Sequence, residues 1–396
     1  MLNYKKILIF SRDIPQLKNA GSILLYRLFR EYETSKLLII GPELDEKFVK
    51  LNCKYYSQKF WIHKLLNSRF YSIINILISL VGAKFIAKVS SKNKKTIREF
   101  YPDMVISVML DYPYYFNAYR IAKKYNIPLH LICHDDVEDF MRLKGIFRTL
   151  MVTKNKKIYR FATTKFVVSP EMGNEFRIRY ETNEYSVLYP NRDEKLRPRP
   201  VNYSKNLRKS PTLVIGYAGS LNYGYDLQLK SMLPAFYGTN TLLFIYADKA
   251  MNHLENCSFE KTVVFKGYSP DPLQTWEKIK EECDAVILPY CFNENGDYEL
   301  YKTHFPSKLT EYLALGLPVI ITGPQYATGV KWGLAHPDAS ITINTFDLKK
   351  YENAFIELKN NDTLRIQLSS KANVYAVQEF DPVKIRELFF SKLAIR

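Results

Sequence analysis

Short runs of apolar residues alternate along the chain with segments in which apolar positions recur at helical spacing. Apolar runs of this length are typical of strands buried on both faces of a parallel sheet. The predicted strands are 6–10, 36–41, 103–108, 128–135, 165–170 and 185–191 in the first half, and one from 212, 240–248, 262–268, 284–290, 317–323 and 340–343 in the second. Because strands and helices alternate, the pattern predicts an α/β fold of parallel sheets flanked by helices, with right-handed crossovers.

The two halves of the chain open with the same arrangement, in which an apolar strand leads through a Gly-Ser loop into a helical pattern. The loops contain Gly21 and Ser22 in the first half and Gly219 and Ser220 in the second. This opening is typical of doubly wound, Rossmann-like domains, and neither loop has the GxGxxG spacing of nicotinamide or flavin sites. The predicted parts are a first domain at 1–192, a polar, proline-punctuated linker at 193–211, a second domain at 212–378 and a C-terminal helix at 379–396.

The chain is basic, and its excess charge lies in the first half. The net charge is +17, and residues 1–200 contain 36 Lys and Arg against 19 Asp and Glu, whereas residues 201–396 contain 21 of each. Around the apolar stretch 70–89, residues 51–100 carry ten basic side chains and one acid, Glu99. Polar interruptions make this stretch a poor membrane span, so we expect either a helix lying at an anionic membrane surface or a buried helix flanked by solvated lysines. The residues predicted to dock are Lys84, Lys88, Lys92, Lys94 and Lys95.

Cysteine usage and the N-terminus favour a cytoplasmic protein, and the basic region at 51–100 favours peripheral association with the inner face of the membrane. The five cysteines form no CxxC pair, which is typical of free thiols in a reducing compartment. The apolar run after Met1 is too short for a signal peptide, and no small-residue cleavage site follows it. No nucleic-acid module is recognisable, so we expect no nucleic-acid partner.

The stretch "FPSKLTEYLALGLPVIITG" at 305–323 carries the most specific chemistry. It predicts a helix that starts near Pro306 and ends at Gly316, followed by a buried strand. Lys308 and Glu311 are three residues apart and share one face of this helix. The lysine, at a helix start, suits a phosphate group, and the carboxylate suits ribose hydroxyls. An exposed salt bridge between the two is the alternative.

In content and order, "GYAGSL", "VVFKGYSP", "AVILPY" and above all the 305–323 stretch resemble the second domain of the GT-B nucleotide-sugar glycosyltransferases. "YSVLYPNRD" resembles the strand before the linker of that family, so the resemblance covers essentially the whole chain. It implies two facing Rossmann-like domains, of which the first handles the acceptor and the second the donor nucleotide. It also implies that the C-terminal helix crosses back to the first domain.

The resemblance also implies roles for individual residues. Glu311 stands where the family binds ribose, Lys308 lies near the donor diphosphate, and His134 resembles a histidine that approaches the transferred sugar. The remaining positions implied to face donor or cleft are Gly219 and Ser220 at the phosphates, Gly267 and Tyr268 at the base, Thr303, His304 and Ser307 before or at the 308 helix, and Gly21 and Ser22 in the first domain's cleft loop.

Two positions depart from the family pattern. Many retaining members have two glutamates separated by seven residues, and the first of these is Thr303 here. A basic residue that is common in the second domain's glycine loop is Ser220. Glu294, Asp297 and Glu299 lie just upstream and are possible replacements for the glutamate. Inversion and retention of configuration therefore both remain open.

Several acidic residues and a histidine lie near the carboxyl ends of predicted strands, where parallel sheets bind ligands. An inverting transferase needs a general base there. The candidates are His134, Asp135, Asp13, Asp111 and Asp136. The segment "HDDVED" at 134–139 also suggests a metal site, but Asp135 and Glu138 have the spacing of a capping box, so we expect solvated helix-start acids and no metal.

The sequence therefore predicts a metal-independent glycosyltransferase that moves a sugar from a nucleotide donor to a glycan or lipid-linked acceptor, as in bacterial surface polysaccharide synthesis, without a cofactor. Two alternatives stay open. A non-catalytic binding partner of the same fold would explain Thr303 and Ser220. A sugar-nucleotide epimerase or hydrolase would need no membrane surface.

Overall fold

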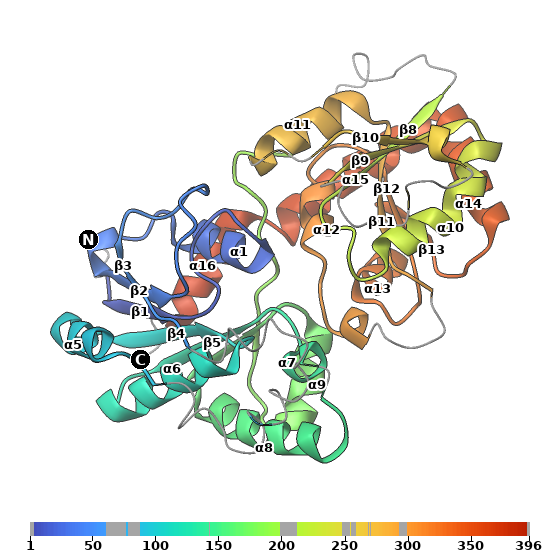
Figure 1. Ribbon diagram of the computed structural model, residues 1–396. Coiled ribbons are helices and arrows are strands. Elements are labelled where there is room, and N and C mark those ends of the chain that lie inside the picture. Colours follow the sequence, from blue (N-terminus) through green and yellow to red (C-terminus); the bar gives the residue numbers. More distant parts are fainter. Residues whose placement is uncertain are drawn as a thin grey trace. The chain divides into compact units, whose positions relative to one another are not determined.

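The computed structural model describes residues 4–60, 77, 88–141, 143–198, 212–247, 254, 259–267, 269, 271–292 and 299–393 (Figure 1). Several sequence predictions lie outside these residues. They are the base-site residue Tyr268, the docking residue Lys84, most of the stretch 70–89, the greater part of the linker, and the acidic positions Glu294 and Asp297.

The chain divides into two units. Unit 1 comprises Met1–Tyr189 and Arg386–Arg396, and unit 2 comprises Pro190–Ile385. The segment after Tyr189 is anchored inside unit 2, where the guanidinium of the buried Arg192 donates a hydrogen bond of 2.9 Å to the carbonyl of Phe380.

Unit 1 is built on a parallel sheet whose seven described strands follow the order β3-β2-β1-β4-β5-β6-β7. The strands are β1 Ile7–Phe10, β2 Leu37–Gly41, β3 Lys54–Ser57, β4 Met104–Val108, β5 Leu129–Cys133, β6 Thr164–Val167 and β7 Ser186–Val187. The central strands are buried along their whole length because helices cover both faces. The sequence missed β3, since its residues are polar or aromatic and half-exposed at the edge of the sheet.

Two sets of helices cover the sheet of unit 1. They are α1 Ala20–Phe29, α5 Ser91–Phe100, α6 Tyr112–Tyr125, α7 Val137–Phe140, α8 Gly145–Phe161, α9 Pro170–Tyr180 and α16 Pro382–Leu393, with a 3₁₀ turn η1 Thr34–Lys36. Helix α1 connects β1 to β2, and α6 connects β4 to β5 in the opposite direction across the sheet. Because such crossovers are right-handed, α1 lies on one face of the sheet and α6 on the other (Figure 1).

Helix α16 belongs to unit 1 from Arg386 onward, although unit 2 precedes it in sequence. Phe389 is fully buried, with its ring centroid 5.6 Å from that of Phe29 in α1 and 4.9 Å from that of Phe166 in β6. Phe390 stacks on Tyr32 at 5.2 Å, and Arg386 forms an ion pair of 2.9 Å with Glu31. The sheet face beneath α1 is therefore completed by residues more than 200 positions further along the chain.

Unit 2 repeats the design with six described strands in the order β10-β9-β8-β11-β12-β13, all parallel. The strands are β8 Leu213–Ala218, β9 Thr241–Tyr246, β10 Val263–Phe265, β11 Ala285–Pro289, β12 Val319–Thr322 and β13 Ser340–Ile343. The helices are α10 Tyr225–Gly238, α11 Pro272–Glu282, α12 Ser307–Tyr312, α13 Thr328–Ala335, α14 Leu348–Asn360 and α15 Asp362–Gln378, with 3₁₀ turns η2 Glu260–Thr262 and η3 Glu299–Lys302. The two sheets confirm the α/β prediction.

In each unit the strand order reverses beside the first strand, at β1 and β4 in unit 1 and at β8 and β11 in unit 2. Doubly wound sheets bind ligands outside the carboxyl ends of the strands at this reversal. Within the described residues, no helix is long and apolar enough to cross a membrane.

Candidate functional site

Several of the residues predicted to bind the donor lie where β8 ends and α12 begins in unit 2. Gly219 follows β8 directly with a φ of +105°, a backbone conformation that favours glycine. A Cβ atom at this position would lie 2.7 Å from Cε of Lys308 and 3.3 Å from its Nζ. The absence of a side chain at Gly219 therefore gives the lysine its space, and the two residues that the sequence singled out lie in contact.

Aromatic rings surround the ammonium group of Lys308. Its Nζ lies 4.6 Å from the ring centroid of Tyr225 and 5.4 Å from that of Tyr217, distances at which a cation is attracted to an aromatic face. Burial lowers the pKa of Lys308 from its ordinary value to about 8, and the charge of Glu311 opposes this shift. At neutral pH Lys308 is therefore still mostly protonated, and its positive charge suits an anion.

Glu311 lies one turn after Lys308 and is only 7% exposed. The pair is therefore not an exposed surface salt bridge, the alternative that the sequence left open. The hydroxyl of Tyr312 accepts a hydrogen bond of 2.9 Å from the backbone N–H of Ala218, which ties α12 to the end of β8. Helix α12 is shorter than predicted, because the chain tightens into hydrogen bonds from Ala314 to Glu311 and from Leu315 to Tyr312 before Gly316.

The other predicted donor residues lie in surrounding turns. Ser220 is exposed, and its Oγ accepts a hydrogen bond of 3.2 Å from the N–H of Asn222. Thr303 is buried at the end of η3, and the carbonyl of the half-buried His304 accepts a hydrogen bond from the Thr328 hydroxyl. The two remaining residues are the half-buried Ser307, whose carbonyl accepts from the Thr310 hydroxyl at 2.9 Å, and Gly267, which follows β10 with a φ of +77°.

Sequence reasoning missed the aromatic rings around Lys308. The chain has thirty tyrosines, so none was informative by itself. Tyr217 and Tyr312 adjoin residues that were singled out, and their position beside Gly219 and Glu311 is the only signal in the sequence.

The carboxyl ends of β1, β4 and β5 bring a second group of polar side chains together in unit 1. A Cβ atom on Gly21 would overlap Oδ2 of Asp13 and would lie 3.3 Å from Cδ2 of His134. Two of the predicted catalytic residues therefore lie against the same glycine. The prediction of a loop at Gly21 and Ser22 is wrong, because the side chain of Asn19 accepts a hydrogen bond of 2.9 Å from the N–H of Ser22 and caps α1 ahead of both residues.

Asp13 is 8% exposed, and its surroundings favour the protonated form. Burial raises the pKa of Asp13 to about 6; the charge of Arg12 opposes this shift, and the negative charges of Asp135 and Asp111 add to it. Arg12 also approaches Asp111, with 3.9 Å between Nε and Oδ2. A carboxylate with a pKa near neutrality can accept and release a proton under physiological conditions.

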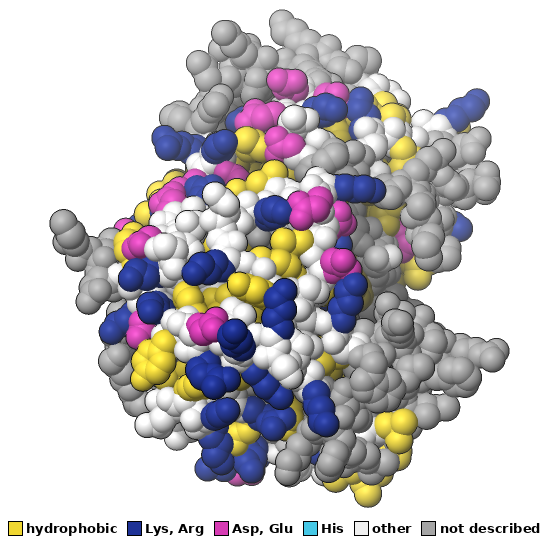
Figure 2. Space-filling model, turned by 60° about the vertical axis from the view of Figure 1, so that its left-hand side comes forward, with side chains coloured by type: hydrophobic (Ala, Val, Ile, Leu, Met, Phe, Trp, Pro, Cys, Tyr) yellow, Lys and Arg dark blue, Asp and Glu magenta, His cyan; other side chains and the backbone are white. Residues whose placement is uncertain are grey.

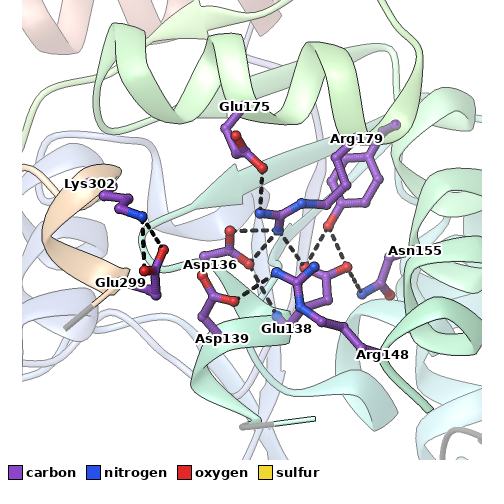
Figure 3. Close-up of polar contacts among 10 residues, drawn as sticks. Asp136, Glu138, Asp139, Arg148, Asn155, Glu175, Arg179, Glu299 and Lys302 are labelled. Atoms are coloured by element: carbon purple, nitrogen blue, oxygen red, sulfur yellow. Dashed lines mark hydrogen bonds and ion pairs between the residues drawn. The ribbon is translucent and has the colours of Figure 1, made fainter. Parts of the chain in front are cut away.

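The rest of the "HDDVED" segment forms a buried ionic network rather than the predicted solvated helix start (Figure 3). The expected capping box is wrong, because Asp136 caps α7 and its carboxylate accepts from the N–H of Glu138. Arg179 of α9 donates to Asp136 at 2.6 Å and to Glu138 at 3.1 Å. Burial and the charge of Glu138 raise the pKa of Asp136 to about 8, against the charge of Arg179.

Glu138 also accepts hydrogen bonds from the Tyr180 hydroxyl at 2.7 Å and from the Asn155 amide at 2.9 Å. Arg148 pairs with Asp139 at 2.8 Å beside this network (Figure 3). These acids therefore fix the segment after His134 and Asp135. Among the described residues, no group of three or more His, Cys, Asp and Glu side chains is placed to hold a metal ion.

Helix α5 and the residues just before it carry the described part of the predicted docking surface. Lys88, Lys92, Lys94 and Lys95 are all exposed. The ammonium of Lys95 lies 3.8 Å from the carboxylate of Glu99, the one acid of that region. The side of unit 1 on which α5 lies comes forward in Figure 2, where Lys and Arg side chains gather on the lower part of the face.

No protein-family model matches the chain, and no curated protein matches it in sequence. Solved structures match it over nearly their whole length. HepE from Anabaena in complex with UDP-glucose has a TM-score of 0.66 at 13% identity, covering 99% of this chain and 100% of that chain. Sucrose-phosphate synthase from Thermosynechococcus elongatus has a TM-score of 0.69 at 12% identity, covering 98% and 99%. WaaG, a glycosyltransferase involved in lipopolysaccharide biosynthesis, has a TM-score of 0.59 at 13% identity, covering 96% and 98%. This likeness confirms the predicted GT-B fold.

Proposed function

We propose that this protein is a glycosyltransferase that moves a sugar from a nucleoside-diphosphate sugar to a hydroxyl group of a glycan or lipid-linked glycan. The observation that carries the proposal is the contact between Lys308 and Gly219 at the end of β8, with the buried Glu311 one turn further on. The ammonium of Lys308, among aromatic rings and next to the backbone of Gly219, suits a diphosphate. The buried carboxylate of Glu311 suits ribose hydroxyls. The GT-B fold, and a neighbour of that fold that binds UDP-glucose, support the same reading.

In the proposed reaction, Lys308 and the backbone at Gly219 and Ser220 neutralise the leaving diphosphate. Glu311 accepts hydrogen bonds from the ribose, and Gly267 lies at the base. Because the lysine supplies positive charge, we expect no need for a metal ion. The acceptor oxygen attacks the anomeric carbon, the bond from that carbon to the diphosphate oxygen breaks, and the diphosphate leaves with that electron pair.

Asp13 is the proposed acceptor of the hydroxyl proton, with His134 and Asp135 beside it. Its pKa of about 6 leaves it ionised at neutral pH but still basic enough to take a proton as the hydroxyl attacks. A base on the acceptor side is what an inverting reaction needs. We therefore propose inversion, which NMR of the product's anomeric configuration would test.

The exposed lysines of α5 support docking of unit 1 to an anionic membrane surface. Each basic residue near such a surface contributes about 1 kcal/mol, so Lys92, Lys94 and Lys95 together contribute about 3 kcal/mol to binding. We propose a peripheral protein at the cytoplasmic face of the membrane, where lipid-linked acceptors for surface polysaccharides are found. Flotation with phosphatidylserine vesicles should lose the protein when these lysines are changed to Gln. Changing Lys349, Lys350 and Lys371 of unit 2 removes the same charge and should leave flotation unchanged.

Thermal unfolding with a panel of nucleoside diphosphates and sugar nucleotides tests the donor site. A ligand at one hundred times its Kd stabilises the folded state by about 2.7 kcal/mol. We expect one nucleotide series to stabilise the wild type, and Lys308→Ala and Glu311→Ala to lose the effect. Lys349→Ala and Glu352→Ala are matched controls, because this pair has the same order and spacing in the chain and an ion pair of 3.3 Å.

If no nucleotide stabilises the wild type, the protein is a non-catalytic partner and the proposal fails. If a nucleotide binds but free or epimerised sugar appears without an acceptor, the hydrolase or epimerase alternative is correct.

A further inference from the structure

Tyr223 has an unusual backbone conformation for a large residue, with a φ of +61°. The structure describes four other non-glycine residues with positive φ, and each stands at the C-terminal end of a helix, where this conformation is common. They are Tyr101, Asn126 and Glu181, which cap α5, α6 and α9, and Asn240 after α10. Tyr223 instead precedes a helix, directly before Gly224 at the N-cap of α10. Tyr223 and Gly224, which has a φ of +78°, are the central residues of a turn closed by a hydrogen bond of 3.4 Å from the N–H of Tyr225 to the carbonyl of Asn222, and such a turn favours Gly, Asn or Asp where Tyr223 stands.

Neighbouring side chains link this residue to Lys308. The hydroxyl of Tyr301 donates a hydrogen bond to the carbonyl of Tyr223. The ring of Tyr301 stacks on that of Tyr225, with 6.2 Å between centroids and 12° between planes. Tyr225 in turn lies under the ammonium of Lys308. The strained residue is therefore linked through two rings to the proposed diphosphate site.

The ring of Tyr223 contributes little to the core, because the residue is 53% exposed. The chain thus keeps a large apolar side chain in contact with water, on a backbone that glycine would adopt with less strain. Strain of this kind persists where the surrounding structure enforces it, and it collects at ligand sites.

The sheet order indicates which part of a donor would meet this ring. Gly267 follows β10, two strands from β8 on one side. Tyr301 lies on the other side of β8, because its hydroxyl receives the N–H of Cys291, at 3.5 Å, just after β11. A diphosphate at Gly219 and Lys308, with its nucleoside directed toward Gly267, would direct its other substituent toward Tyr223. That substituent is the sugar.

We propose that the exposed ring of Tyr223 binds the sugar of the donor, with the C–H face of a pyranose against the aromatic face. Aromatic faces carry partial negative charge and attract such polarised C–H groups. This inference rests on the proposed function and deepens it by assigning a residue to sugar recognition.

The test compares binding of each nucleoside diphosphate with binding of its sugar conjugates, by calorimetry. The probes are UDP, GDP, ADP and dTDP, each alone and as its glucose, galactose, mannose and N-acetylglucosamine conjugate. Loss of the ring in Tyr223→Gly and Tyr223→Ala should weaken binding of the preferred conjugate by about tenfold, equivalent to about 1.4 kcal/mol, and leave the bare diphosphate unchanged. Tyr223→Phe should keep the wild-type affinity.

Thermal unfolding separates the ring from the backbone. Tyr223→Gly should unfold at a higher temperature than Tyr223→Ala, because only glycine relieves the positive φ, yet both should bind the conjugate equally weakly. Tyr101→Gly is the matched control, since Tyr101 is 71% exposed with a φ of +51° in unit 1, and its binding should equal that of the wild type.

Three results would overturn the inference while the donor site stands. They are unchanged conjugate binding in Tyr223→Ala, equal loss of diphosphate and conjugate, and a wild type that binds every conjugate like its bare diphosphate. If the wild type binds none of the probes, the proposed function fails first.

Discussion

Raising the pH should weaken donor binding, because Lys308 loses its proton. With a pKa of about 8, Lys308 is mostly protonated at pH 7 and mostly neutral at pH 9. The diphosphate of a sugar nucleotide keeps its full charge throughout this range, so the protein supplies the titrating group. If only protonated Lys308 binds, affinity follows its protonated fraction, which falls from about 0.9 to about 0.1, and the Kd rises by about tenfold.

Isothermal titration calorimetry at pH 7, 8 and 9 and constant ionic strength measures this change. Buffers of different ionisation enthalpy should also reveal uptake of nearly one proton per ligand bound at pH 9, because the anion restores the charge of the lysine. Lys308→Arg is the matched variant, since a guanidinium stays protonated and its affinity should not change with pH. Lys349→Ala should behave as the wild type.

The reasoning is refuted if wild-type affinity stays constant from pH 7 to pH 9 without proton uptake. It is equally refuted if Lys308→Arg loses affinity as steeply as the wild type, because another group would then be titrating.

Three further predictions concern unit 1. Asp13→Asn should lower kcat/KM by at least about a hundredfold, and in the wild type kcat/KM should fall about tenfold per pH unit below the Asp13 pKa of about 6; a steady-state pH profile checks both. Burial lowers the pKa of His130 in β5, a residue only 1% exposed, to about 4, so its folded form binds fewer protons than the unfolded form and stability should fall by about 2 kcal/mol from pH 7 to pH 5. Urea unfolding of His130→Phe should lack that loss, and an identical loss in the variant would show that other groups cause it. Arg179→Ala should destabilise unit 1 by about 3–5 kcal/mol in the same assay, because the buried carboxylate of Glu138 loses its cation and the carboxyl group of Asp136 loses its donor. Arg148→Ala at a half-exposed pair should cost less than about 1 kcal/mol.

The arrangement of strands was predictable because each buried strand had to be apolar along its whole length. The apolar runs that form β8, β11 and β12 are typical of strands in a sheet that helices cover on both faces. Strand β3 was not predicted, because a strand at the edge of a sheet is partly exposed and needs no continuous apolar run. The end of α12 was predicted too late in the chain. Local hydrogen bonds within its last turn, rather than Gly316 alone, end the helix.

The candidate site was partly predictable because some of its chemistry is local in sequence. Lys308 and Glu311 share one turn, so their spacing alone places them together. The contact between Asp13, Gly21 and His134 depends on three strands meeting at one edge, which only the sheet order specifies. The pairing of Asp136 and Glu138 with Arg179 spans about 40 residues, and no pattern in the sequence signals it.

Helix α16 gives the protein a definite order of assembly during synthesis. Unit 2 is continuous, so it can fold as soon as Ile385 has left the ribosome. Unit 1 must wait for Phe389 and Phe390, which cover apolar surface on α1, even though its strands emerge first. The half of the protein that is synthesised first is therefore completed last, and until then Phe29 and Phe166 stay available to chaperones.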